Sequence, residues 1–308
     1  MKTLRALVYR NCKLFFKDKG MFFTALITPV ILLVLYITFL GNVYKNSLLS
    51  ELPEGLNLDN NLIDGFVGGQ LISSILAVSC VTVAFCSNML MVSDKVSGAR
   101  ADLTVSPVKP SVLSLSYYLS SMISSLIICY FTACIGFAYI ASVGWYLSAS
   151  DVVLLLLDIF LTVSFGTALS SVIHYFLSSQ GQLSAVGTIV SSGYGFLCGA
   201  YMPLSQFGEG FRNVLAFLPG TYATALFRTH ALSGVIEEMA TSGFPKEALD
   251  AFRDVFDCNI YFFGTRVSAT VSYAILAGAI LLCMGVFVLL NSRGLKKPIF
   301  RHKLQKST

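Results

Sequence analysis

Long stretches without charge constrain the fold of this chain more than any other feature. Six of them occur in its 308 residues: 21–44, 65–93, 110–150, 152–182, 183–208 and 267–292. Asp158 is the one charged residue that they contain, and charged residues make up only 12% of the whole chain. A soluble domain carries about twice that share of charge. The composition therefore indicates a protein built for lipid.

Each stretch is long enough to cross a bilayer, because a helix of about 20 apolar residues spans a hydrocarbon core of about 30 Å. The sequence predicts an all-α, polytopic membrane protein with six transmembrane helices. The predicted spans are residues 21–41, 66–93, 112–143, 152–176, 183–203 and 267–291.

Positive charge is concentrated in segments that flank these spans. Residues 1–20 hold six Lys and Arg against one acid, the tail 292–308 holds six and no acid, and the insert 94–111 holds three. The loop after the first span has Lys45 against four acids. Because Lys and Arg mark cytoplasmic loops, both termini and the insert are predicted to be cytoplasmic. The compact length and the absence of glycosylation sequons favour a bacterial plasma membrane.

The amino-terminal 20 residues predict an amphipathic helix that lies along the cytoplasmic membrane surface. At 100° per residue, the apolar and small residues share one side and the basic residues the other. The first side comprises Leu4, Leu7, Val8, Asn11, Cys12, Leu14 and Phe15. A frayed basic tail is the alternative.

Residues 204–262, between the fifth and sixth predicted spans, contain an apolar segment that is too short to cross. It covers residues 214–227 and is interrupted by Pro219-Gly220. Broken apolar segments occur at membrane depth where protein or water satisfies the backbone. We therefore expect a re-entrant helical hairpin that enters from the outer face, with an outer-surface loop as the alternative. The acidic stretch 233–257 predicts an external helical cap.

Three motifs, in this order and spacing, resemble the type-2 permease subunits of ATP-binding-cassette (ABC) exporters. The motifs are Phe16-Lys17-Asp18-Lys19 before a span with Pro29, the insert with Gly98, Asp102-Leu103 and Ser106-Pro107-Val108, and Gly199 to Ser205 followed by Pro219-Gly220-Thr221-Tyr222 and Arg228. The insert departs from the family pattern at Ala99, where the family usually has Thr, and the Pro usually found near residues 207–210 is missing.

The resemblance implies that residues 1–308 form a single transmembrane permease domain without catalytic activity. The sequence has no phosphate-binding loop of the type Gly-x-x-x-x-Gly-Lys-Ser/Thr. No cofactor is expected in this chain, and ATP and Mg are expected in a cytoplasmic ABC ATPase subunit. The other implied partners are a second permease, identical or different, and membrane lipid, but not nucleic acid. Peptides, lipid-like molecules, antibiotics and glycans are all compatible substrates.

The resemblance also assigns two groups of residues. The insert 94–111 is expected to be the coupling segment that the ATPase pushes, through Asp94, Lys95, Gly98, Arg100, Asp102 and Pro107; a solvated connecting loop is the alternative. The hairpin is expected to gate the outer end of the pathway through Tyr201, Met202, Pro203, Phe217, Pro219, Tyr222 and Arg228. Arg228 is expected to end the second limb and to reach the interface or pair with an acid such as Glu209.

Two intramembrane features remain open in the sequence. Asp158 is either a functional acid inside the bundle or an acid within reach of interfacial water. Ser191, Gly195 and Gly199 form a small-residue stripe, which is typical of a seam between two permeases or of packing inside one chain. A secondary transporter and a polytopic membrane enzyme are the alternative functions, although the sequence has neither several intramembrane charges nor a convergent catalytic set.

Overall fold

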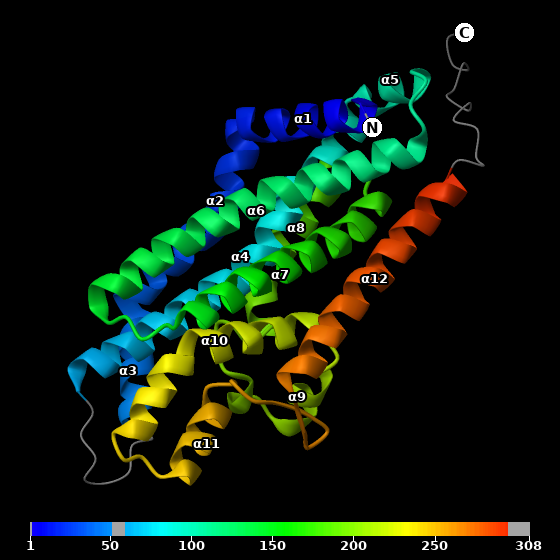
Figure 1. Cartoon of the computed structure of the whole chain (residues 1–308). Coiled ribbons are helices and arrows are strands. Elements are labelled where there is room, and N and C mark those ends of the chain that lie inside the picture. The colour runs from blue at the N-terminus through cyan, green and yellow to red at the C-terminus, as the bar shows by residue number, and fades with distance from the viewer. Residues whose placement is uncertain (1, 51–58, 295–308) are drawn as a thin grey trace.

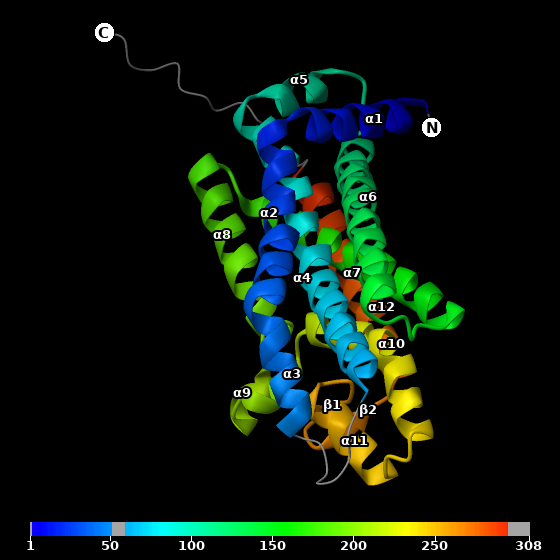
Figure 2. The same ribbon diagram turned by 90° about the vertical axis from the view of Figure 1, so that its left-hand side faces the viewer.

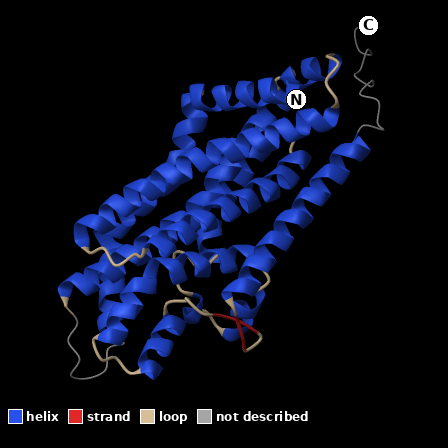
Figure 3. Cartoon of the chain, in the orientation of Figure 1, coloured by secondary structure: helices blue, strands red, loops and turns tan. Residues whose placement is uncertain are grey.

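Helices follow one another along the chain in the computed structural model, which describes residues 2–50 and 59–294 (Figures 1 and 3). The α-helices are α1 Lys2–Lys17, α2 Lys19–Leu35, α3 Gly41–Ser50, α4 Asn60–Val96, α5 Ala99–Val105, α6 Pro110–Val143, α7 Ala149–Phe176, α8 Gln180–Leu197, α9 Glu209–Leu215, α10 Pro219–Thr241, α11 Lys246–Val255 and α12 Ala269–Gly294. The π-helical turn η1 (Tyr36–Leu40), the 3-10 turn η2 (Leu204–Gln206) and the strands β1 (Ile260–Phe262) and β2 (Thr265–Val267) complete the described elements. Most of the predicted basic tail lies outside the described residues.

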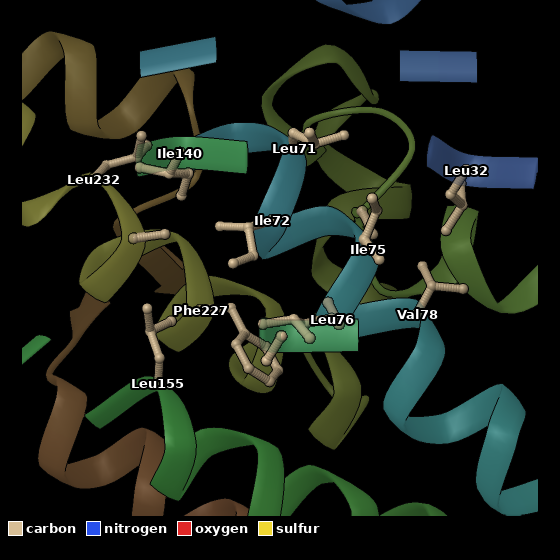
Figure 4. Close-up of a cluster of buried hydrophobic side chains, with 14 of the residues drawn as sticks. Leu32, Leu71, Ile72, Ile75, Leu76, Val78, Ile140, Leu155, Phe227 and Leu232 are labelled. Atoms are coloured by element: carbon tan, nitrogen blue, oxygen red, sulfur yellow. The ribbon is translucent and has the colours of Figure 1, made fainter. Parts of the chain in front are cut away.

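The central element is α4, a helix of 37 residues that is buried along most of its length. Its apolar side chains pack against Leu32 of α2, Ile140 of α6, Leu155 of α7 and Phe227 of α10 (Figure 4). Glycine allows the closest approach to α10, because a Cβ at Gly69 would lie 2.8 Å from the carbonyl oxygen of Ala231. The helices α2, α6, α7, α8 and α10 therefore surround α4 (Figure 2).

Five helical segments in the described chain are long and apolar enough to cross a membrane. They are Lys19–Leu49, Asn60–Val96, Pro110–Val143, Ala149–Phe176 and Ala269–Asn291. Each coincides with a predicted span, and the protein is an all-helical multi-pass membrane protein. The remaining prediction, 183–203, falls on α8, which has only 18 residues and carries Gln180 and Gln182 in its first turn. This helix ends at Leu197 because Gly199 adopts a left-handed φ of +76°.

The two ends of the bundle carry different elements. The helices α1 and α5 and the last turn of α12 lie at one end, and α11 and the β-hairpin lie at the other (Figures 1 and 2). The predicted amphipathic helix α1 lies across the bundle and buries Leu7, Asn11 and Phe15. Leu14, which was expected on the same side, is 36% exposed.

The segment 204–262 differs from the expectation in two respects. The second limb does not end at Arg228, because α10 continues to Thr241 and ends only before Gly243, whose φ is +91°. The segment also ends in the first strand of an antiparallel hairpin, β1–β2, in which Phe262 pairs with Thr265 just beyond it. Its strands have three residues each, which is too short for alternating hydrophobicity to reveal.

Candidate functional site

The predicted coupling segment is a short helix that stands at one end of the bundle. Gly98, with φ +86°, turns the chain from α4 into α5, and Pro110 begins α6. Asp102 and Pro107 are exposed, Arg100 is half-buried, and Val105 at the end of α5 is 89% exposed. The segment therefore presents both charged and apolar side chains outside the bundle (Figure 1).

Asp94 makes its contacts inside the chain. It is 6% exposed and accepts hydrogen bonds from Arg10 Nη1 at 2.7 Å and from the hydroxyl of Tyr117 at 2.6 Å. The hydrogen bond with Asp94 raises the pKa of the Arg10 guanidinium. Asp94 thus fastens the end of α4 to α1 and α6.

Lys95 also makes internal contacts. Its Nζ donates to the carbonyl oxygens of Tyr175 and Leu177, each at 2.8 Å. The last carbonyls of a helix have no partner within the helix, and an ammonium group is favourable there. Lys95 therefore joins the base of the coupling segment to the end of α7.

Arg228 is the most deeply buried charged side chain at the other end of the molecule, with an exposed fraction of 0%. Its Nη1 donates to Asp257 at 2.9 Å and its Nη2 to the carbonyl oxygen of Gly199 at 2.6 Å. Asp257 also accepts from the backbone N–H groups of Leu204 and Ser205. The partner of Arg228 is therefore Asp257 rather than Glu209, and the pair ties α10 to the turn after α8 and to the end of α11.

The residues expected to form the outer gate make different contacts in the single chain. Tyr201 packs edge-on against Phe196, with ring centroids 5.0 Å apart. Tyr222 is buried and donates to the carbonyl oxygen of Ala216. Phe217 is 64% exposed and contacts the rings of the hairpin tip, Phe262 and Phe263.

Three further gate residues, Met202, Pro203 and Pro219, have different surroundings. Met202 is half-buried and Pro203 is buried. Pro219 occupies the first turn of α10, where proline begins a helix without losing a hydrogen bond.

Asp158 is buried in the bundle, with an exposed fraction of 1%, and its neighbours come from three helices. Oδ2 lies 2.6 Å from His230 Nδ1 on α10, and Oδ1 accepts a hydrogen bond of 2.8 Å from the hydroxyl of Tyr273 on α12. Sequence reasoning singled out the acid but missed both partners. The signal available for His230 was its place two residues after Arg228 in an otherwise apolar segment.

The small-residue stripe of α8 packs largely within the chain. A Cβ at Gly195 would come within 2.2 Å of the Tyr201 ring, and one at Gly199 within 2.9 Å of Leu204. Earlier on the same side of α8, Ser184, Thr188 and Ser192 are exposed. Of the two explanations for the stripe, a seam between permeases or packing inside one chain, Gly195 and Gly199 fit the second.

A cavity of about 470 Å³ lies between α10, the β-hairpin and the start of α12. Thr229, Cys258, Asn259 and Ser272 are among its lining residues. Burial raises the pKa of the Cys258 thiol to about 12. The cavity thus contains a thiol that is accessible in part but weakly reactive at neutral pH.

The comparisons with known proteins agree with the resemblance noted in the sequence. A family model described as ABC-2 type transporter matches residues 2–231, which include the coupling segment, α8 and most of α10. Comparison with curated proteins gave no significant match.

Proposed function

The chain belongs to the ABC-2 type transporter family, and we propose that it is the membrane-spanning permease subunit of an ATP-driven exporter. A separate cytoplasmic ABC ATPase binds ATP and Mg and hydrolyses the ATP. The present chain contributes the pathway and the surface on which the ATPase acts. The exported substrate leaves at the end that carries α11 and the β-hairpin.

The observation that carries this proposal is the construction of the coupling segment. Its base is fixed by the bonds of Asp94 and Lys95 to α1, α6 and α7. Its tip is exposed, with Val105 at 89% and Asp102 beside it. A rigid base with an exposed apolar tip suits an element that is seated in a partner and moved by it.

Six crossings, with both termini in the cytoplasm, are part of the proposal. The end of α7 lies beside the coupling segment, because Lys95 binds its last carbonyls. The start of α12 lies at the opposite end, beside the β-hairpin. The chain between them must pass from one end to the other, and α8 is the helix that begins this passage. Eighteen residues give about 27 Å, so α8 with the following turn is long enough.

A pair of permease subunits is also proposed. The exposed part of α8 carries the hydroxyl groups of Ser184, Thr188 and Ser192, together with the large apolar side chain of Ile189. Lipid offers these groups no partner, although Thr188 and Ser192 also donate to carbonyl oxygens of their own helix. The surface is therefore better suited to a second permease or to the substrate path between two permeases.

The test is reconstitution with the soluble ATPase subunit that co-purifies with the chain. The chain alone is expected to bind no ATP, and the complex is expected to hydrolyse ATP faster than the ATPase alone. Val105→Glu is expected to remove most of this stimulation, whereas Thr104→Glu, the same change one residue earlier on α5, is expected to leave most of it.

Equal stimulation by both variants would contradict the role of the exposed tip. Export that followed a proton gradient and needed no ATPase would instead favour a secondary transporter, for which the buried pair of Asp158 and His230 is a suitable proton site.

A further inference from the structure

We propose that α7 transmits movement of the coupling segment to the outer helix α10, with Lys95 at the receiving end and His230 at the delivering end. The inference rests on the proposed function and names the route inside it. These are positioning residues, because they act through the helices that they join.

The receiving end is a direct link between the coupling segment and α7. Lys95 lies three residues before Gly98, the left-handed residue at which α5 begins. Its Nζ holds two carbonyl oxygens at the end of α7, those of Tyr175 and Leu177. Lys95 is in the last turn of α4, directly before the turn into α5. A displacement of α5 that moves this turn therefore pulls on the end of α7 through two charge-assisted hydrogen bonds, which are stronger than neutral ones.

Between its two ends, the route follows one continuous helix, α7. Seventeen residues of α7 separate Asp158 from Tyr175, which corresponds to about 26 Å at 1.5 Å per residue. No proline interrupts α7, so a sharp kink has no source there. At Gly166 the helix lies directly on α4, since a Cβ there would come 3.0 Å from the Cα atom of Val81. This part of α7 is thus supported by the central helix α4.

The delivering end is the buried cluster of Asp158, His230 and Tyr273. Asp158 receives hydrogen bonds from α10 and α12, and it has little access to water as a substitute. Breaking such a contact leaves a buried charge without a partner, which is costly. When α7 moves, α10 is therefore expected to move with it, because resisting the movement would break the contacts of Asp158.

Three consecutive residues of α10 extend the link to the outer surface. His230 contacts α7, Thr229 Oγ1 donates to the carbonyl oxygen of Cys258 at 3.0 Å, and Arg228 holds Asp257 and Gly199. Successive helical side chains point about 100° apart, so these three bind α10 on several sides at one level. A shift of His230 therefore disturbs the turn that carries Cys258.

Cys258 is consequently a native reporter of the outer end. Its thiol is half-buried, lines the outer cavity and is weakly reactive while it stays in place. Any movement of α10 that uncovers it will increase its rate of reaction.

The experiment uses the permease–ATPase complex in nanodiscs and a membrane-impermeant methanethiosulfonate reagent. The modification rate of Cys258 is measured without nucleotide and with ATP plus vanadate, and Cys258→Ser gives the background. In the wild type, nucleotide is expected to change the rate by about fivefold or more, a usual size for coupling between sites. Lys95→Met and His230→Gln are each expected to reduce that change to near unity.

Two variants serve as controls for folding and for the helix itself. Lys95→Arg keeps donors for the two carbonyl oxygens and is expected to retain the response. Asp151→Asn alters an acid in the first turn of the same helix, outside the route, and is also expected to retain it. ATP hydrolysis measured in the same samples reports whether the motor is bound.

The outcomes separate the inference from the proposed function. A wild-type complex without a nucleotide response would overturn the proposed coupling to an ATPase and the inference with it. A normal wild-type response that persists in Lys95→Met would overturn only the route through α7. The same holds if His230→Gln retains the response.

Discussion

The buried carboxylates of the described chain each have at least two hydrogen-bond donors. Asp94 is held by Arg10 and Tyr117, Asp158 by His230 and Tyr273, and Asp257 by Arg228 and two backbone N–H groups; Asp151 takes part in a capping box. Membrane interiors require such pairing because water is not available as a substitute. At the scale of the residue, these acids therefore serve mainly to join helices.

The sequence could single out Asp158, but not whether it is buried or what it binds. A single acidic residue in an apolar run is easily recognised in the sequence. His230 lies 72 positions away, and the sequence does not distinguish it from a histidine at the membrane interface. Which helix faces meet is decided by packing around α4, and single-helix periodicity does not contain that information. The same reason explains why Asp94 and Lys95 were assigned to an outside partner.

Loss of the Arg228 side chain is expected to destabilise the protein strongly. Arg228→Met leaves Asp257 buried without its cation, and breaking a buried pair in this way costs about 3–5 kcal/mol. Thermal unfolding in detergent measures the effect. The matched control is Arg253→Met, which breaks the exposed pair with Asp250 and is expected to cost less than about 1 kcal/mol. Equal effects of the two changes would contradict the structural role given to Arg228.

The reactivity of Cys258 on intact cells is expected to depend steeply on pH. Its pKa of about 12 means that the thiolate is scarce at neutral pH and increases about tenfold with each pH unit up to that value. The rate of modification by an impermeant methanethiosulfonate should therefore still be rising between about pH 8.5 and 9.5. A cysteine placed at exposed Ser242 should level off above its ordinary pKa of about 8.5.

The same labelling experiment tests the orientation of the chain. A cysteine placed at Ser97, in the coupling segment, is expected to remain unlabelled from outside at any of these pH values. Labelling at Ser97, or a plateau for Cys258 near pH 8.5, would contradict the placement of these residues.

At the scale of elements, local signals predicted most of the architecture. The uncharged runs gave the positions of α2, α4, α6, α7 and α12, and the sidedness of residues 2–17 gave α1. Local signals did not predict where α10 ends. Arg228 looks like a terminus when a buried cation is assumed to be impossible, yet Asp257 neutralises it and the helix continues.

The turn at Gly98 provides a test of the coupling element. Its φ of +86° suits glycine, and a Cβ at this position would meet no atom within 4 Å, so the effect of a substitution is conformational. Gly98→Ala is expected to cost about 1 kcal/mol, and Gly98→Asn less, because asparagine tolerates the left-handed region. Gly98→Pro, whose ring fixes φ near −65°, should disturb α5 most.

The measurement is ATP hydrolysis by the reconstituted complex, with membrane insertion as a control. Stimulation should decrease in the order glycine, asparagine, alanine, proline. Full stimulation in Gly98→Pro would indicate that the segment is a passive connection between α4 and α6.

At the scale of the whole molecule, the exposed surface is not uniform around the bundle. The outward side of α12 carries large apolar residues, with Leu281 73% and Leu282 70% exposed, as a lipid-facing helix should. On α8 the exposed residues instead include Ser184, Thr188 and Ser192, together with Ile189, which is 68% exposed. This helix is not among the five in the described chain that are long and apolar enough to cross a membrane. The reason is its polar and small residues, among them Gln180 and Gln182.

This asymmetry predicts where two copies of the chain meet. If α8 faces α8 of a second, identical permease across a two-fold axis, a cysteine at Thr188 has a partner cysteine close to it. Disulfides form only when the Cα atoms are within about 7 Å, so oxidation should give a covalent dimer from Thr188→Cys and none from Leu281→Cys on α12. Both are made with exposed Cys134 replaced by serine, and dimers are counted on non-reducing gels. A dimer from the α12 variant alone would move the contact to α12 and return the exposed residues of α8 to lipid.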